Sequence, residues 1–426
     1  MEVYLKNCRI YREGRITLSD VYIGNGVYLP VTSFDRDIPV VSAQNLLIAP
    51  SFCDLHVHLR EPGFSYKETI ESGTRAAAKG GFTTISAMPN LNPVPDSLES
   101  LRIELELIGK QAVIEVLPYA AITRGEKGLE LADIQDMAEL CCGYSDDGNG
   151  VQSEEIMKSA MQAIAKTGRF LAAHVEDNSY VMPNGTLHPG IASRRFIQQV
   201  IPPEAEYIQL RRDMKLVEET GVRYHLCHIS TKESVDIIRK AKQSGLQVTC
   251  EVTPHHFSFS DGDIIEDSGR FKMNPPLRGE EDRNAILTGL SDGTIDVIAT
   301  DHAPHSKQEK TGGLSLSAFG TVGLETAFAA ANTFLVKTGI VSPERLFYLM
   351  CDKPREILNR KTAEGFVLLD TEWEETVDPK SFLSLGSSTP FEGQKLKGKV
   401  VMTVCNGKTI YIDGGYAGEQ AEKAGV

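Results

Sequence analysis

Two histidines stand one residue apart near the end of an apolar run, and this spacing suits the binding of a metal ion. The run extends from Ser51 to Arg60 and contains His56 and His58. Side chains at positions i and i+2 of a β-strand point to the same side, so the two imidazoles would be directed at one point. Two neutral imidazoles held in this way supply half of the ligands of a zinc site. The prediction of a metal site then depends on whether further ligands end later strands.

The elements that would position such ligands alternate along residues 46–361. Eight β-rich runs are expected, and helical patterns separate most of them. The expected strands cover residues 46–58, 82–88, 112–122, 141–147, 170–176, 224–230, 246–253 and 295–302, and the clearest helices cover residues 66–79, 97–110, 154–166, 205–219 and 232–243. Eight β/α units predict a closed (β/α)8 TIM barrel of the α/β class, with its active site at the carboxyl ends of the strands.

The two ends of the chain follow a different pattern. Residues 1–45 and 362–426 consist of short β-rich runs interrupted by glycines, and the crossing from the barrel is expected within residues 359–362. Neither end holds enough strands to form a core by itself. We therefore expect residues 1–45 and 362–426 to pack together as a small β-sandwich accessory domain beside a barrel domain of residues 46–361.

Composition excludes several classes of function. The formal net charge of -14 over 426 residues argues against a nucleic-acid partner, which would require a basic surface. No apolar run approaches the roughly 20 residues that a membrane span needs, and the first residues lack the pattern of a signal peptide. The eight cysteines include no CxxC pair, which is typical of reduced thiols in a cytosolic protein. The sequence thus predicts a cytoplasmic protein without a nucleic-acid or membrane partner.

Further potential ligands end four of the later strands. An imidazole or a carboxylate stands at each of these strand ends. At the fourth strand either Asp146 or Asp147 could be the ligand, because a shift of the strand by one residue would exchange their positions. Together with the first strand, the predicted ligands are His56, His58, Asp147, His174, His228 and Asp301. This mixture suits zinc or another first-row divalent ion, and six ligands could hold a pair of ions. His188, His225 and His256 are interpreted as structural histidines.

Five motifs give the chain a resemblance to a known family. They occupy residues 54–63, 87–90, 145–148, 272–278 and 300–305. With them the chain resembles the cyclic amidohydrolases, and most closely the bacterial type-I dihydroorotases, over nearly its whole length. Many relatives bridge their metals with a carboxylated lysine on the fourth strand, which has no lysine here. The resemblance implies that an aspartate takes this place, Asp147 better than Asp146, and that one or two zinc ions bind.

The resemblance also implies a reaction, the reversible hydrolysis of dihydroorotate to N-carbamoyl-L-aspartate in pyrimidine biosynthesis. Zinc lowers the pKa of a bound water to about 7 and so supplies hydroxide. Asp301 would take up the proton and return it to the leaving nitrogen, or else serve only as a metal ligand. Arg60 would bind the substrate carboxylate through two parallel hydrogen bonds. The other expected substrate contacts are His58, Asn90, Asn274, His305, Phe319 and Gly320, and residues 306–319 are expected to form a polar, mobile loop over the site.

Two other functions compete with this one. The chain could hydrolyse a different cyclic amide, as hydantoinases and allantoinases do, or it could be a catalytically silent scaffold for aspartate transcarbamoylase. Dihydroorotate is favoured by Arg60, Asn90 and the loop of residues 272–278, because these residues would bind a carboxylate on the substrate ring. A silent homologue would be expected to lose ligands, and none is missing. A homodimer and an association with a transcarbamoylase stay open.

Overall fold

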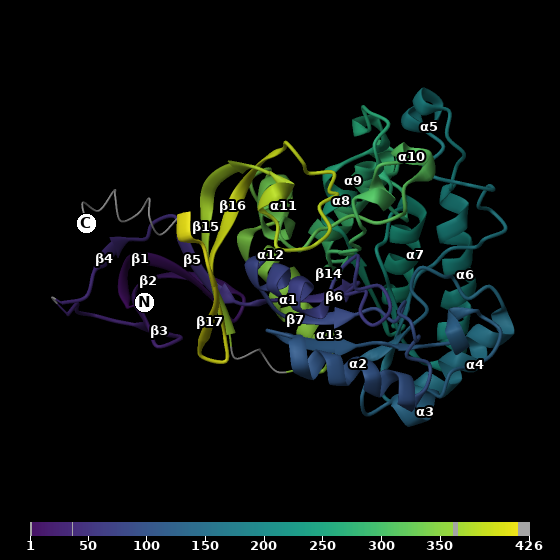
Figure 1. Cartoon of the computed structure of the whole chain (residues 1–426), viewed down its shortest axis with the longest axis horizontal. Coiled ribbons are helices and arrows are strands. Elements are labelled where there is room, and N and C mark those ends of the chain that lie inside the picture. Colours follow the sequence, from purple (N-terminus) through teal and green to yellow (C-terminus); the bar gives the residue numbers. More distant parts are fainter. Residues whose placement is uncertain (1, 36, 361–364, 416–426) are drawn as a thin grey trace.

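The computed structural model describes residues 2–35, 37–360 and 365–415 and consists of a barrel and a flanking β-sheet (Figure 1). The expected crossing at 361/362 lies outside the described residues. Parallel strands pair in chain order around the barrel, in a three-stranded and a six-stranded arc. These strands are β6 (Phe52–Val57), β7 (Phe82–Ala87), β8 (Glu115–Pro118), β9 (Ala120–Ala121), β10 (Gly143–Ser145), β11 (Phe170–Ala173), β12 (Arg223–Leu226), β13 (Val248–Val252) and β14 (Val297–Ile298).

The barrel closes between its first and last strands. Strands β8 and β9 are separated only by Tyr119 and together occupy the third strand position of the barrel. The barrel therefore has eight strand positions around its core. Val57 pairs with His302 in a parallel bridge, and the backbone N–H of His58 donates to the carbonyl of His302 at 2.9 Å. Both oxygens of Asp54 also lie 3.2 Å from the backbone nitrogen of Thr300. The predicted α/β barrel is confirmed.

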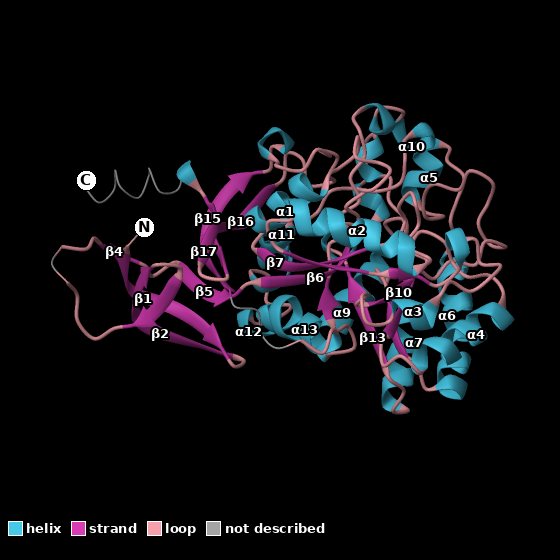
Figure 2. Ribbon diagram, turned by 60° about the horizontal axis from the view of Figure 1, so that its bottom comes forward, coloured by secondary structure: helices cyan, strands magenta, loops and turns pink. Residues whose placement is uncertain are grey.

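Helices surround the strands (Figure 2). Helix α7 shows why they form, since the Thr231 side chain caps its first turn and Val235, Ile238 and Ala241 face the core. The helix expected at residues 66–79 begins only at Ile70, where Thr69 supplies the cap. The helices are α1 (Ile70–Lys79), α2 (Leu98–Gln111), α3 (Ile134–Met137), α4 (Glu154–Ala165), α5 (Ile191–Phe196), α6 (Pro203–Thr220), α7 (Lys232–Gln243), α8 (Pro254–Ser258), α9 (Glu280–Asp292), α10 (Gly313–Leu316), α11 (Ala327–Ala331), α12 (Pro343–Phe347) and α13 (Lys353–Ile357). No helix within the described residues is both long and apolar enough to cross a membrane.

The expected single strand over residues 46–58 is in fact two strands in different sheets. Strand β5 (Leu46–Pro50) pairs with both ends of the chain in the flanking sheet, whereas β6 begins the barrel. Ser51 lies between them and hydrogen-bonds Thr83 through its hydroxyl. An uninterrupted apolar run carries no signal for such a change of partners, because both strands are buried.

The flanking sheet unites the two ends of the chain. Its strand order is β17-β16-β15-β5-β1-β2-β3, with β4 paired to β1, and it curls around its own apolar cluster in a sandwich-like manner. In Figure 1 the purple N-terminal strands lie beside the yellow C-terminal ones. Its remaining strands are β1 (Val3–Arg12), β2 (Arg15–Gly24), β3 (Val27–Pro30), β4 (Val40–Ser42), β15 (Gly365–Thr376), β16 (Lys395–Cys405) and β17 (Lys408–Ile412). The division into domains at residues 45/46 and 361/362 remains a proposal.

Candidate active site

Asp147 lies at the centre of four imidazoles at the carboxyl ends of the barrel strands. Its Oδ1 is 3.4 Å from Nε2 of His56, 3.5 Å from Nε2 of His228 and 3.8 Å from Nδ1 of His174. Its Oδ2 is 3.3 Å from Nε2 of His58. All five side chains are buried. Residues from β6 and from the segments that follow β10, β11 and β12 thus converge on one point, as the pattern of strand ends predicts.

Asp301, which follows β14, completes the cluster. Its Oδ1 lies 3.1 Å from Nε2 of His58 and 3.5 Å from Nε2 of His56. Three groups have ligand atoms close enough to share a cation, namely His56 with His58 and Asp301, Asp147 with His174 and His228, and His56 with Asp147 and Cys227. The structure thereby brings together all six residues expected to hold metal.

Several atoms of this cluster are buried without a hydrogen-bond partner. They are Nε2 of His56, Oδ1 of Asp147 and Nε2 of His174. A buried polar atom without a partner costs about 1–3 kcal/mol. The atoms of His56 and Asp147 lie 3.4 Å apart, so these two together call for a further binding partner. The donor set of imidazole nitrogens and carboxylate oxygens is the one that zinc prefers. The residues therefore fit a divalent cation.

The outer nitrogens of the first two histidines are fixed by acceptors. Nδ1 of His56 lies 2.6 Å from Oε1 of Glu251, and Nδ1 of His58 lies 2.9 Å from Oδ1 of Asn90. With Nδ1 of each ring occupied in this way, the Nε2 atoms face Asp147 and Asp301. Each imidazole is thus oriented to bind a cation through Nε2.

Glu251 is a site residue that the sequence analysis missed. Its second oxygen lies 3.0 Å from Nε2 of His225, and its first accepts the backbone N–H of His228 at 3.3 Å. One buried carboxylate thus holds His56, His225 and the chain at His228. Its position in the sequence could have indicated a site residue, because a glutamate inside the apolar strand β13 is buried and requires polar partners.

Asp146 and Asp147 have different surroundings. Oδ1 of Asp146 accepts the backbone N–H groups of Ile122 at 2.7 Å and Thr123 at 3.0 Å, and its Oδ2 accepts the Thr123 hydroxyl. Asp146 therefore ties the fourth strand to the end of the third, and it belongs to none of the three groups within the described residues that could share a cation. This geometry favours Asp147 as the ligand.

Charges within the cluster oppose the effect of burial. Burial disfavours the imidazolium of His56, yet the carboxylates of Asp147 and Glu251 outweigh it and raise the pKa of His56 well above its usual value. Burial would likewise raise the pKa of Asp147, but the charge of His56 holds it well below its usual value. Burial would also raise the pKa of Asp301, but a hydrogen bond from His58 and the charge of His56 outweigh this effect and lower it. Both shifts favour the ionised carboxylates, which can receive a cation.

Three of the expected site residues adopt left-handed backbone conformations. Arg60 has φ 64°, His228 has φ 32° and Asp301 has φ 46°. Such conformations cost side-chain-bearing residues about 1–3 kcal/mol each and are kept where the surroundings enforce them. They turn the chain at the strand ends and so direct these side chains at the barrel mouth.

Arg60 is a buried cation beside the cluster. Its side chain is 8% exposed, Nε donates to the carbonyl of Pro304 at 3.2 Å, and Nη2 lies 3.4 Å from Nε2 of His305. Among the residues that the structure describes, no aspartate or glutamate forms an ion pair with it. Burial lowers the pKa of Arg60, and the charges of Asp301 and Asp147 partly offset this effect. A guanidinium in such a position can receive an anionic ligand.

The comparisons with known proteins agree with this geometry. The Dihydro-orotase-like family profile matches residues 45–234. A dihydroorotase of Fusobacterium nucleatum subsp. nucleatum is 46% identical over 418 residues, which cover 96% of this chain and 98% of that protein. A dihydroorotase of Geobacillus sp. is 45% identical and covers 97% of this chain and 100% of that protein. The chain belongs to the dihydroorotase family.

Solved structures show the same fold. An L-hydantoinase from Arthrobacter aurescens superimposes with a TM-score of 0.83 at 23% identity, covering 97% of this chain and 96% of its own. A dihydropyrimidinase from Brevibacillus agri superimposes with a TM-score of 0.80 at 18% identity, covering 97% of this chain and 95% of its own. At these identities the likeness concerns the fold alone.

In this dihydroorotase-family chain, His305 lies between Arg60 and the loop of residues 306–319. Nε2 of His305 lies 2.7 Å from the carbonyl oxygen of Phe319, and Nδ1 lies 3.4 Å from Nζ of Lys67. Burial and the nearby charges of Arg60 and Lys67 lower the pKa of His305 to about 3. His305 is therefore neutral, with its N–H on Nε2 donating to the Phe319 carbonyl and its Nδ1 left as the acceptor that faces Lys67. With its Nε2 used in this way, His305 lies beside the Arg60 guanidinium without accepting a hydrogen bond from it.

The segment of residues 306–319 is anchored more firmly than its composition indicates. Nζ of Lys310 donates to the carbonyls of Ala318 and Gly320, each at 2.7 Å, and of Lys272 at 3.2 Å. Leu314, in α10, is 0% exposed and packs in an apolar cluster. The stretch expected as a polar loop thus contributes one residue to a core, and the sequence does not reveal it, because one apolar residue within polar neighbours gives no periodic signal. Its closure over a substrate stays a prediction.

Gly320 is required by close packing. It has φ 128°, and a Cβ atom there would lie 2.7 Å from the carbonyl oxygen of Ala303. The preceding Phe319 is 36% exposed, with Nζ of Lys272 4.7 Å from its ring centroid. These contacts hold residues 319–320 against the loop that carries Asp301 and His305.

Asn274 forms its side-chain hydrogen bond with Glu176. Its Nδ2 donates to Oε2 of Glu176 at 2.8 Å, while its Oδ1 is buried without a partner. Contact of Asn274 with a substrate remains a proposal.

Two of the histidines interpreted as structural have protein partners. Nδ1 of His225 contacts Thr249 at 2.8 Å, and Nε2 of His256 contacts the carbonyl of Pro275 at 3.0 Å.

Proposed function

We propose that this protein is a dihydroorotase, which interconverts dihydroorotate and N-carbamoyl-L-aspartate in pyrimidine biosynthesis in the cytoplasm. The observation that carries the proposal is Arg60, a buried guanidinium beside the metal-ligand cluster with no acidic partner among the described residues. Dihydroorotate carries a carboxylate on its ring, which would supply that partner through two parallel hydrogen bonds. A hydantoin or another neutral ring would leave Arg60 buried and unpaired, which disfavours the first alternative.

The metal site would be occupied by one or two zinc ions. His56, His58, Asp147, His174, His228 and Asp301 are the proposed ligands. Zinc would lower the pKa of water and polarise the ring carbonyl. The presence of all six residues disfavours a silent scaffold. A homodimer and an association with aspartate transcarbamoylase remain separate proposals.

Asp301 is the proposed acid–base group. Its ionised carboxylate would take one proton from the attacking water as the oxygen bonds to the ring carbonyl carbon. The same proton would then pass to the amide nitrogen as the carbon–nitrogen bond breaks. The left-handed conformation of Asp301 and its contact with His58 would hold the carboxylate in position for both transfers.

The remaining side chains would bind and orient the substrate. Asn90 uses its Oδ1 on His58, which leaves its amide N–H groups for a ligand. With Arg60 and His305 it would surround the substrate carboxylate, and His58 would contact the ring carbonyl. Asn274, Phe319 and Gly320 are proposed to border the ring.

Metal analysis combined with an assay on three substrates tests the proposal. Zinc-containing protein should hydrolyse dihydroorotate but not hydantoin or allantoin. Turnover of hydantoin or allantoin instead would establish the first alternative, and bound zinc without turnover of any of the three would establish the scaffold.

Arg60→Lys tests the part assigned to the guanidinium. A lysine cannot form the two-pronged contact, so kcat/KM for dihydroorotate should fall about 100-fold, which corresponds to about 2.7 kcal/mol. The control is Arg75→Lys, because Arg75 forms an exposed pair with Glu71 on α1 and should leave kcat/KM unchanged. Unchanged kinetics in Arg60→Lys would refute the assignment.

A further inference from the structure

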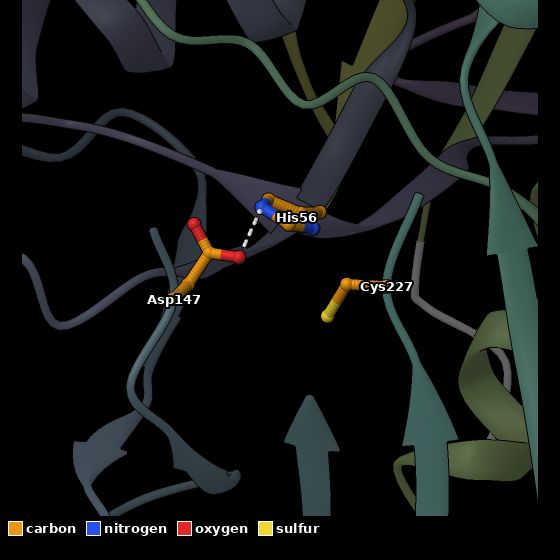
Figure 3. Close-up of side chains that lie close together, drawn as sticks. All are labelled: His56, Asp147 and Cys227. Carbon is orange, nitrogen blue, oxygen red and sulfur yellow. Dashed lines mark ion pairs between the residues drawn. The ribbon is translucent and has the colours of Figure 1, made fainter. Parts of the chain in front are cut away.

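A thiol lies beside the metal-ligand cluster and has no part in the proposed reaction. Cys227 follows β12, is 1% exposed and stands next to His228 in the chain. Figure 3 shows it near His56, which lies in β6, and Asp147, which lies in the loop after β10. A ligand atom from each of the three residues lies within 4.8 Å of the other two.

We propose that the metal-ligand cluster has a second mode of metal binding, in which a thiophilic cation such as Cd2+ is held by Cys227, His56 and Asp147. Two of these ligands present buried atoms without hydrogen-bond partners, Nε2 of His56 and Oδ1 of Asp147, which are 3.4 Å apart. The thiol supplies a third ligand of a different chemical kind. Thiolate prefers soft cations, whereas carboxylate oxygens prefer harder ones.

The other cysteines do not offer such a site. All eight are free, and among the described residues only Cys227 belongs to a group that could share a cation. Cys53 is as buried as Cys227 and lies in the same apolar cluster. The difference between these two thiols is therefore their neighbours rather than their burial.

The two modes of binding exclude each other. Nε2 of His56 has one lone pair, so an ion bound to Cys227 removes His56 from the group with His58 and Asp301. The same ion takes an oxygen of Asp147 from the group with His174 and His228. Binding replaces the S–H proton of Cys227 by a sulfur–metal bond and releases that proton to solvent. A soft cation in this position would thus compete with zinc.

Cadmium binding to metal-free protein tests the proposal without any activity measurement. Titration with CdCl2 should produce the ultraviolet charge-transfer band of a cadmium–thiolate bond, with one thiolate per ion, and a 113Cd NMR shift typical of a sulfur ligand. Cys227→Ala and Cys227→Ser should lose both signals and bind Cd2+ at least about tenfold more weakly, since even residues that only orient metal ligands are worth 10–100-fold in affinity.

Cys53→Ala is the matched control and should retain both signals. An equal band in Cys227→Ala, or a wild-type 113Cd shift typical of nitrogen and oxygen ligands only, would overturn the proposal. If Cys227→Ala proves unfolded by circular dichroism, the nearly isosteric Cys227→Ser and the wild-type NMR shift decide.

Inhibition by cadmium is the one consequence that rests on the proposed function. Half-inhibition of dihydroorotate hydrolysis should require at least about tenfold more Cd2+ in Cys227→Ser than in wild type. Equal inhibition of both would overturn the competition between the two modes. Absence of turnover in untreated wild type would instead refute the proposed function and leave the spectroscopic result standing.

Discussion

Removal of the Glu251 carboxylate should weaken zinc binding although Glu251 is not a ligand. The carboxylate accepts from Nδ1 of His56 at 2.6 Å, from Nε2 of His225 at 3.0 Å and from the backbone N–H of His228 at 3.3 Å. It thereby fixes which nitrogen of His56 faces the cation. Carboxylates that orient metal-binding histidines are worth 10–100-fold in metal affinity.

Two substitutions separate its charge from its hydrogen bonds. In Glu251→Gln the amide oxygen can still accept from His56, while the amide N–H must face His225, whose Nε2 can become an acceptor if Nδ1 donates to Thr249. Zinc affinity should then fall only about tenfold, or about 1.4 kcal/mol. Glu251→Ala leaves three buried donors without acceptors. Its zinc affinity should fall about 100-fold, and the free energy of unfolding of the metal-free protein should fall by about 3 kcal/mol.

Competition with a chromophoric chelator measures the zinc affinity, and urea unfolding measures the stability. The control is Glu104→Gln, because Glu104 on α2 is also buried and burial raises its pKa well above the usual value, which favours its neutral form. This variant should change neither quantity. Zinc affinities of both Glu251 variants within about twofold of wild type would refute the reasoning.

Three other perturbations give separate tests. Asp147→Ala should lower zinc occupancy, measured by metal analysis, much more than Asp146→Ala, and the reverse order would move the ligand by one residue. Gly320→Ala should lower the free energy of unfolding by about 1–3 kcal/mol, because its φ of 128° and its Cβ distance of 2.7 Å to a carbonyl both oppose a side chain. Gly168→Ala, with φ 72° and open space around it, should cost less in the same urea experiment. Burial and the charge of Lys272 lower the pKa of Lys310 to about 7, so its buried charge is a cost below pH 7 that is relieved as pH rises toward the unfolded pKa of about 10.4. Wild type should therefore gain about 1–2 kcal/mol over Lys310→Met between pH 7 and 9, and parallel stability curves would contradict this.

The sequence predicts the ligand cluster well because its signal is local. His56 and His58 share one face of a strand through the two-residue period, and the other ligands follow strands that the chain places side by side. The offset between Asp146 and Asp147 could be resolved only by the backbone N–H groups of Ile122 and Thr123, which hold Asp146 away from the cluster.

The features that the sequence analysis missed depend on contacts between distant residues. Glu251 is 195 positions from His56, and no spacing rule connects them. Leu314 is a single apolar residue among polar ones, and its burial follows from the neighbouring Phe271 and Met273. The division of residues 46–58 into two strands depends on β15, which lies more than 300 positions later.

That pairing with β15 has a practical consequence for anyone who wishes to shorten the protein. Strand β5 is held between β1 and β15, one from each end of the chain, and it leads through Ser51 straight into the strand that carries His56. A fragment cut at residue 46 to isolate the barrel would expose both edges of β5. The segment that leads into β6, the strand of His56, would then lose the contacts that hold it in place. The barrel and its two tails are therefore best expressed, tagged and crystallised as one piece.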